Sequence, residues 1–158
     1  MVTTRRDPEG RRTVFDLLPE GGGSLVSVGR LYRASSGLLL LTTDTQLANF
    51  LTDPDNRIPR QYVVTVRGMV TDTSVARLLA GIEGLRASRV SIRKRSARET
   101  HLLIELVEGK NREIRRMLEA LGHEVTRLLR IAFGPIVLGA LQPGQWREVS
   151  PRELKSIR

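Results

Sequence analysis

The feature that most constrains the fold is a series of short apolar or alternating segments joined by short connections. In QYVVTVR, residues 61–67, Tyr62, Val64 and Val66 share one face of a strand, so Tyr62 can point inward. Similar patterns predict strands over 25–28, 38–42, 89–94, 102–107, 124–131, 136–141 and 145–149. Because short connections favour antiparallel neighbours, we expect an α+β domain with a large, mainly antiparallel sheet and helices packed on it.

Four helices are indicated by apolar spacing and by capping residues. One begins at Thr43 or Asp44 and ends before Pro54, and a second is capped by Asp72 or Thr73. The clearest helix runs from an N-cap at Asn111 to Leu121 and is ended by Gly122, and SPRE at 150–153 forms a capping box before a fourth.

The charge of the chain favours a polyanionic partner. Lys and Arg number 26 against 17 Asp and Glu, for a formal charge of +9, and most of the cations are arginine. The planar fork of arginine suits phosphate, which favours nucleic acid over a membrane surface; the alternative is a basic, well-solvated surface. No apolar run approaches the roughly 20 residues of a membrane span, and the absence of cysteine suits a reducing compartment such as the cytoplasm.

Three arginines crowd the first turns of the helix predicted at 111–121. Arg112, Arg115 and Arg116 lie where the helix dipole is already positive, so a bound phosphate would relieve an arrangement that is locally unfavourable. The alternative is that Glu108, Glu113 and Glu119 neutralise these arginines in surface pairs worth at most about 1 kcal/mol each.

Three long segments resemble the successive motifs of one enzyme family. They are GRLYRASSGLLLLTTD at 29–44, RQYVVTVRG at 60–68 and EGKNREIRRMLEALGHEVTRLLRIAFGPIVLGAL at 108–141. They resemble the RsuA family of ribosomal RNA pseudouridine synthases, and the match runs from about Val2 to Leu154. The resemblance implies the pseudouridine synthase fold with a central basic cleft, and an isomerase that converts a flipped-out uridine of ribosomal RNA to pseudouridine without cofactor or metal.

The resemblance also implies the organisation of the chain. We expect one catalytic domain over 1–158, acting as a monomer. Many family members carry a lysine-proline pair before the first strand and a separate N-terminal RNA-binding domain, and this sequence shows neither. We therefore expect target choice to depend on this domain or on its assembly context.

Residue roles follow from the motifs, position by position. The family's catalytic aspartate, in a GRLD turn, falls at position 32, its arginine ion-pair partner at Arg115, and the tyrosine that packs against the target base at Tyr62. Arg30 falls on the arginine of the GRLD turn. We further expect RNA-binding residues at Arg30, Arg33, Lys110, Arg112 and Arg116.

Position 32, however, is Tyr32. An aspartate with a pKa of about 3.9 is ionised at neutral pH, whereas a phenol with a pKa of about 10 is ionised in roughly one molecule per thousand. A ring is also too long to present its oxygen where a carboxylate would lie. We therefore expect this chain to be inert or nearly so.

Three hypotheses remain open. The chain is a pseudouridine synthase whose carboxylate is replaced, naturally or by construction; or an RNA-binding pseudoenzyme of the same fold; or a basic structural protein that shares only the fold. Arg30, Tyr62 and Arg115 favour the first two over the third. His101 and His123 have no acid-rich spacing that indicates a metal site.

Overall fold

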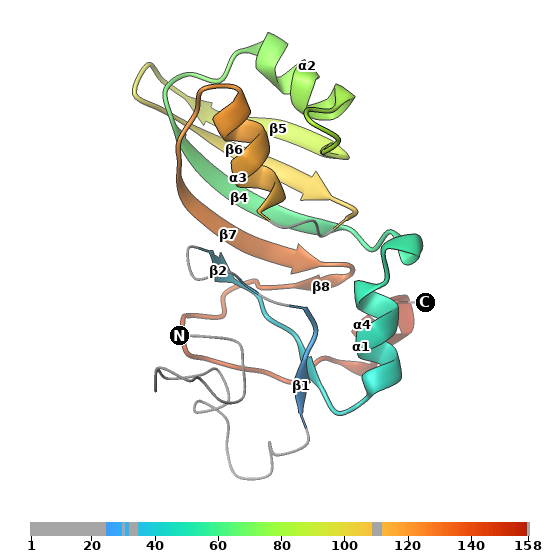
Figure 1. The fold of residues 1–158 in the computed structure, drawn as a ribbon. Coiled ribbons are helices and arrows are strands. Elements are labelled where there is room, and N and C mark those ends of the chain that lie inside the picture. Colours follow the sequence, from blue (N-terminus) through green and yellow to red (C-terminus); the bar gives the residue numbers. More distant parts are fainter. Residues whose placement is uncertain (1–24, 30, 32–34, 109–111, 158) are drawn as a thin grey trace, which may run out of the picture.

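The computed structural model describes residues 25–29, 31, 35–108 and 112–157. Its centre is a six-stranded sheet in the order β2-β7-β4-β6-β5, with β8 paired to β7 (Figure 1). The strands are β2 (Ser36–Gly37), β4 (Arg60–Arg67), β5 (Arg89–Arg95), β6 (Glu99–Leu106), β7 (Val125–Phe133) and β8 (Ile136–Val137). All pairs are antiparallel except β2 with β7. The expected α+β class and the mainly antiparallel mixed sheet are confirmed.

The central strand β4 follows the alternation read from its sequence. It pairs with β6 from Arg60↔Leu106 to Arg67↔Glu99, and with β7 from Arg60↔Phe133 to Val66↔Val125. Val64 and Val66 are fully buried, and Tyr62 packs against the same hydrophobic cluster. The inward face predicted for Tyr62 is therefore confirmed.

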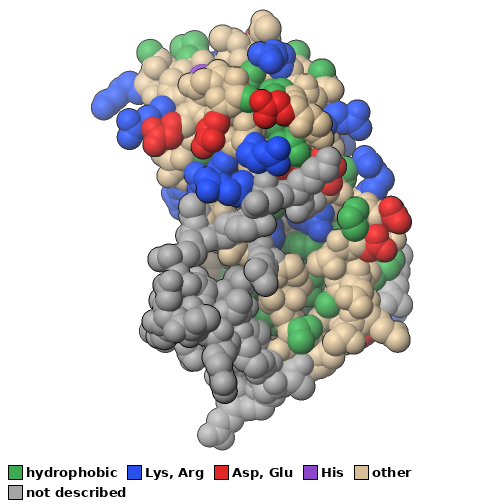
Figure 2. Space-filling view, in the orientation of Figure 1, with side chains coloured by type: hydrophobic (Ala, Val, Ile, Leu, Met, Phe, Trp, Pro, Cys, Tyr) green, Lys and Arg blue, Asp and Glu red, His purple; other side chains and the backbone are tan. Residues whose placement is uncertain are grey.

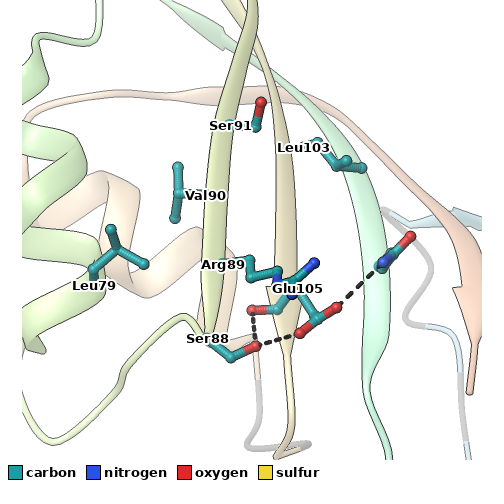
Figure 3. A pocket seen from close by; sticks show the side chains of 8 residues that line it. Leu79, Ser88, Arg89, Val90, Ser91, Leu103 and Glu105 are labelled. Carbon is teal, nitrogen blue, oxygen red and sulfur yellow. Dashed lines mark hydrogen bonds between the residues drawn. The ribbon is translucent and has the colours of Figure 1, made fainter.

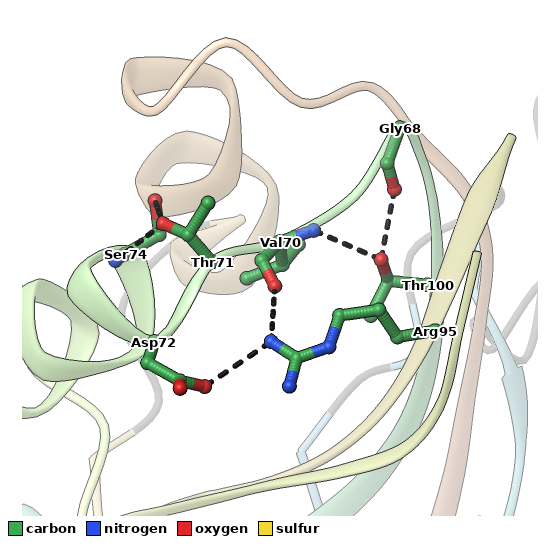
Figure 4. Close-up of polar contacts among 7 residues, drawn as sticks. All are labelled: Gly68, Val70, Thr71, Asp72, Ser74, Arg95 and Thr100. Atoms are coloured by element: carbon green, nitrogen blue, oxygen red, sulfur yellow. Dashed lines mark hydrogen bonds and ion pairs between the residues drawn. The ribbon is translucent and has the colours of Figure 1, made fainter. Parts of the chain in front are cut away.

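Two helices, α2 (Asp72–Ala80) and α3 (Glu113–Ala120), cover one face of this sheet (Figure 1). Leu78 of α2 and Met117 and Leu118 of α3 pack fully buried against the inward residues of β4 and β6, and this group is the upper cluster. The N-cap of α2 is Thr71, not Asp72 or Thr73, because the Thr71 hydroxyl accepts from the Ser74 amide at 3.1 Å (Figure 4).

The predicted start of α3 differs from the structure. The proposed N-cap Asn111 lies outside the described residues, and the helix begins at Glu113 after Arg112, which has a left-handed φ of 50° and no side-chain cap bond. Gly122, with φ of 86°, follows the helix end as expected.

A second group of elements lies below the sheet in Figure 1. It contains β1 (Val26–Ser27), β3 (Leu41–Thr42), α1 (Thr45–Thr52), the 3₁₀ helix η3 (Pro54–Asn56) and α4 (Pro151–Ser156). Its lower cluster is built on buried Val28, Leu38, Leu40, Ala48, Leu51, Phe133, Ile136 and Ile157. Asp44 caps α1 by accepting from two amides, and Ser150 and Glu153 form the predicted capping box of α4.

Several predicted strands are wrong in extent. The segment 38–42 is not one strand: β2 precedes it and pairs with β7, whereas β3 at its end pairs with β1. The strand predicted at 102–107 begins earlier, at Glu99, and that at 136–141 shrinks to β8. No strand forms over 145–149, where the Arg147 guanidinium instead donates to Val137 O and to both Glu153 carboxylate oxygens.

Gly37 provides a stringent test of the β2–β7 pairing. Its φ is 110°, and a Cβ there would lie 2.2 Å from the Arg130 carbonyl oxygen. Gly37→Ala should therefore push β2 off β7 and lower the free energy of unfolding by about 3 kcal/mol, measured by urea denaturation. In the control Gly144→Ala, the backbone is also left-handed but a Cβ meets nothing, so the cost should be about 1 kcal/mol. Equal losses would refute a steric origin.

The Arg147–Glu153 pair should make stability depend on acid pH. The hydrogen bond from Arg147, then the Ser150 amide, lower the pKa of Glu153 to about 2. Because a folded-state pKa below the unfolded value stabilises the ionised form, this contribution is present above about pH 4.5 and is lost as pH falls toward 2. Melting temperatures measured across that window should drop less steeply in Glu153→Gln than in the unmodified chain; parallel curves would contradict the assignment.

Candidate functional site

The residues predicted to form the site divide into two groups. Tyr32, Arg30, Arg33 and Lys110 lie outside the described residues. Among the others, Tyr62 lies on β4, Arg115 and Arg116 on α3, and Arg112 immediately before α3. The described part of the predicted site is therefore the helix-covered face of β4 with the start of α3.

Tyr62 lies where the upper and lower clusters meet. Its ring is half-buried against the upper cluster, and its cross-strand neighbour on β7 is Arg130. Burial lowers the pKa of the Arg130 guanidinium, and the nearby Tyr62 phenol partly offsets this by raising it. An aromatic ring is thus held beside a cation on one face of the sheet.

Arg130 is buried, with only 4% of its surface exposed. Its Nε donates to Leu38 O at 2.8 Å, and its backbone oxygen accepts from Leu38 N at 2.8 Å. The guanidinium carbon lies 5.3 Å from the centre of the Phe133 ring, a cation–π distance. Within the described part of the chain, Nη2 of this guanidinium has no hydrogen-bond partner.

A second buried arginine shares this ring. The Arg60 guanidinium carbon lies 4.8 Å from the centre of Phe133, and its Nη2 reaches Leu51 O at 3.4 Å. Burial lowers the pKa of Arg60, and the positive charge of Arg130 lowers it further, whereas Tyr62 and Glu113 raise it. Glu113, at the start of α3, is itself 2% exposed. Because this carboxylate is buried, any pair that it forms with the α3 arginines is not the surface pair considered from the sequence.

The α3 arginines differ from one another in their surroundings. Arg112 and Arg116 are exposed, whereas Arg115 is half-buried and its Nη1 donates to Val125 O on β7 at 3.2 Å. Val125 precedes Arg130 by five residues, roughly 17 Å along an extended strand. In Figure 2 Lys and Arg side chains recur on this face at the level of α3. Tyr62 and Arg115 thus share one face, but their backbones are separated along it.

Sequence reasoning missed the buried part of the site. Arg60, Arg130 and Phe133 received no role, although Arg60 precedes Tyr62 by two positions and so shares its strand face. A cation at an inward position of a strand was the available signal. The described pocket, in contrast, is lined mostly by residues of β5, β6 and β4, with Leu79 from α2, and contains neither Tyr62 nor Arg115 (Figure 3).

The chain matches the family model described as RNA pseudouridylate synthase over residues 4–120. It belongs to this family. The match confirms the resemblance read from the motifs. The structure is also similar to the solved "Crystal structure of pseudouridylate synthase", with a TM-score of 0.80 and 28% identity over 92% of this chain and 65% of the other.

Relatives of the chain include proteins named ribosomal large subunit pseudouridine synthase B. That of Vibrio cholerae is 42% identical across 99% of this chain and 51% of its own length, and that of Pseudomonas aeruginosa is 43% identical across 97% and 42%. The chain thus spans about half the length of these relatives. An RNA pseudouridine synthase of Aquifex aeolicus is 38% identical over 96% of the chain and 63% of its own length.

A more distant structure shares the fold alone. The archaeal box H/ACA Nop10–Cbf5 complex matches 78% of this chain with a TM-score of 0.57 and 18% identity. Among the described residues, no group of three or more His, Asp or Glu side chains could hold a metal ion. No helix in this part of the chain is long and apolar enough to span a bilayer.

A double-mutant cycle tests whether the buried charges act together. We expect Arg60→Met and Glu113→Gln each to destabilise the fold, and the double variant to lose less than the sum, with a coupling energy of about 1–3 kcal/mol. The matched control is the exposed pair Arg67 and Glu124, 3.1 Å apart, where the coupling should stay below about 1 kcal/mol. A buried coupling no larger than the exposed one would show that Arg60 and Glu113 act independently.

Proposed function

We propose that this chain is the catalytic domain of a ribosomal RNA pseudouridine synthase that binds a uridine of large-subunit ribosomal RNA. The observation that carries the proposal is the 42% and 43% identity, over nearly the whole chain, to two proteins named ribosomal large subunit pseudouridine synthase B. The net charge of +9 supports an RNA partner, because phosphate neutralisation dominates such binding.

In this proposal each described residue has a distinct task. The half-buried ring of Tyr62 contacts the flipped base, and the Arg130 guanidinium beside it fixes the ring's position. The exposed Arg112 and Arg116 contact phosphates near the start of α3. Arg115 is the proposed ion-pair partner of a carboxylate at position 32.

Tyr32 itself favours a second candidate function, an RNA-binding pseudoenzyme. A neutral phenol can neither supply the negative charge that an aspartate would place beside Arg115 nor match its reach. A phenol ring is also larger than a carboxymethyl group, so we expect it to compete for volume that a flipped base requires. Isomerisation by the chain as written is therefore expected to be absent or nearly so, while RNA binding is retained.

Restoring the carboxylate tests both candidates. We expect Tyr32→Asp to release tritium from C5-labelled uridine in large-subunit ribosomal RNA transcripts, since it returns a charge partner to Arg115 and frees space. The matched control is Tyr32→Asn, which opens the same space without the charge and should stay inactive. Adding Arg115→Met to Tyr32→Asp should remove the restored activity.

The alternative outcomes are informative as well. Comparable release from the Tyr32 chain would overturn the argument from phenol chemistry and require another acid. No release from any variant, with binding to the transcripts retained, would favour the RNA-binding pseudoenzyme.

A further inference from the structure

The sheet face opposite α2 and α3 presents a different chemistry from the candidate site. The cross-strand register aligns Ser91, Leu103, Val63 and Leu129 in one row across β5, β6, β4 and β7. Their neighbours in the sequence, such as Ile92, Leu102 and Val64, point to the helix side and pack in or against the upper cluster. The side chains on this outward face, opposite α2 and α3, therefore make none of the contacts described for Tyr62.

The chain segment at the edge of this face is strongly basic. Residues 84–98 contain six cations and no acid: Arg86, Arg89, Arg93, Lys94, Arg95 and Arg98. All six are exposed. Arg95 turns to the helix side, where its Nη1 meets Asp72 at 3.1 Å and Val70 O at 3.0 Å (Figure 4). In the described part of the chain, none of the other five cations forms an ion pair.

A β-bulge concentrates this charge. The register of β5 against β6 shifts between Ile92 and Lys94, so that Arg93 is inserted beside Lys94, which lies opposite His101. Arg98 follows in the turn between the strands, where its carbonyl accepts from Gly68 N at 2.8 Å. Arg93, Lys94 and Arg98 thus gather at the end of the β5–β6 hairpin, which we name the hairpin tip.

The acids of the same region are already engaged. Glu99 lies 3.1 Å from His101 Nε2, and Glu124 lies 3.1 Å from Arg67. Glu105 accepts from Gln61 at 3.2 Å and from Ser88 at 2.9 Å (Figure 3). In the described part of the chain, none of these acids forms an ion pair with Arg93, Lys94 or Arg98.

We propose that the hairpin tip is a second RNA-docking surface, which contacts the phosphate backbone of a double-stranded segment near the target uridine. This inference rests on the proposed function. The tip contains mostly arginine, whose fork matches phosphate, and residues 84–108 contain no Phe, Tyr or Trp ring on which unpaired bases could stack. The one imidazole of this segment, that of His101, is half-buried and bonded to Thr65 and Glu99. A duplex backbone is the RNA feature read by charge alone.

The position of the hairpin tip fits this role. Figure 1 places the β5–β6 turn at the end of the sheet away from β1 and α1. Along β4, Tyr62 and Arg67 are separated by five residues, roughly 17 Å, and Arg67 pairs with Glu99 next to the tip. A stem beside the target nucleotide would span this distance, so one RNA could reach both surfaces around the sheet edge.

The test compares two variants. One removes the three positive charges of the hairpin tip, and the other removes three positive charges from a different part of the surface. The variant Arg93→Gln/Lys94→Gln/Arg98→Gln is matched by Arg77→Gln/Arg152→Gln/Lys155→Gln, which also removes two exposed arginines and one exposed lysine. Both are titrated with stem–loop transcripts of large-subunit ribosomal RNA across a range of KCl concentrations. Each duplex phosphate contact contributes about 0.9 to the slope of log affinity against log salt.

We expect the hairpin-tip variant to lose about 2–3 units of this slope and to bind about tenfold more weakly, and the control to lose less than about one unit. Excess RNA duplex, but not single-stranded poly(U), should abolish the difference between the two variants. Equal losses of slope from both variants would mean a net-charge effect and overturn the proposal. An unchanged slope in the hairpin-tip variant, while the unmodified chain binds the transcripts, would also overturn it. An unmodified chain that binds no ribosomal RNA would overturn the proposed function itself.

Discussion

The Arg130 guanidinium contacts both hydrophobic clusters of the fold. It lies over Phe133, a member of the lower cluster, and beside Tyr62, which packs against the upper one. Its Nε and its backbone oxygen both bond to Leu38, which attaches the segment after β2 to β7. The relative placement of the two clusters, and hence of every residue proposed for the site, depends on these contacts.

Two buried cations around one ring are costly for folding. Desolvation lowers the pKa of both Arg60 and Arg130, and each charge is placed near the other. A hydrophobic pair of similar size would serve a purely structural purpose as well or better. Two such cations fit the proposed role of a site that binds an anionic or polar ligand, because groups already desolvated and oriented in the fold need no reorganisation when the ligand binds.

The sequence predicted best those features that are formed by residues only a few positions apart. The alternation in β4 and the capping box of α4 are short-range features, and both are confirmed. The start predicted for α1 at Thr43 or Asp44 is close to the observed start at Thr45, which Asp44 caps. The splitting of 38–42 depends on Arg130, a partner 92 residues away, which no local pattern reveals. The loss of 145–149 accompanies side-chain bonds of Arg147 to Val137 and Glu153, which an alternation pattern does not register. Tyr62 was assigned to the site from its motif, whereas the grouping of Arg60 and Arg130 around the Phe133 ring joins two strands and became visible only in the structure.

The single parallel pair, β2 with β7, has a consequence for the timing of biosynthesis. The hydrogen bond between Leu38 and the Arg130 guanidinium spans 92 residues of chain. At about 5–20 residues per second, a ribosome would release the first partner roughly 5–20 s before the second. During that interval β2 has no strand to pair with, so the segment behind the site must remain soluble as a nascent chain until β7 emerges. The site therefore assembles only after β7 has been synthesised, and a premature stop before β7 would leave the earlier motifs translated but unassembled.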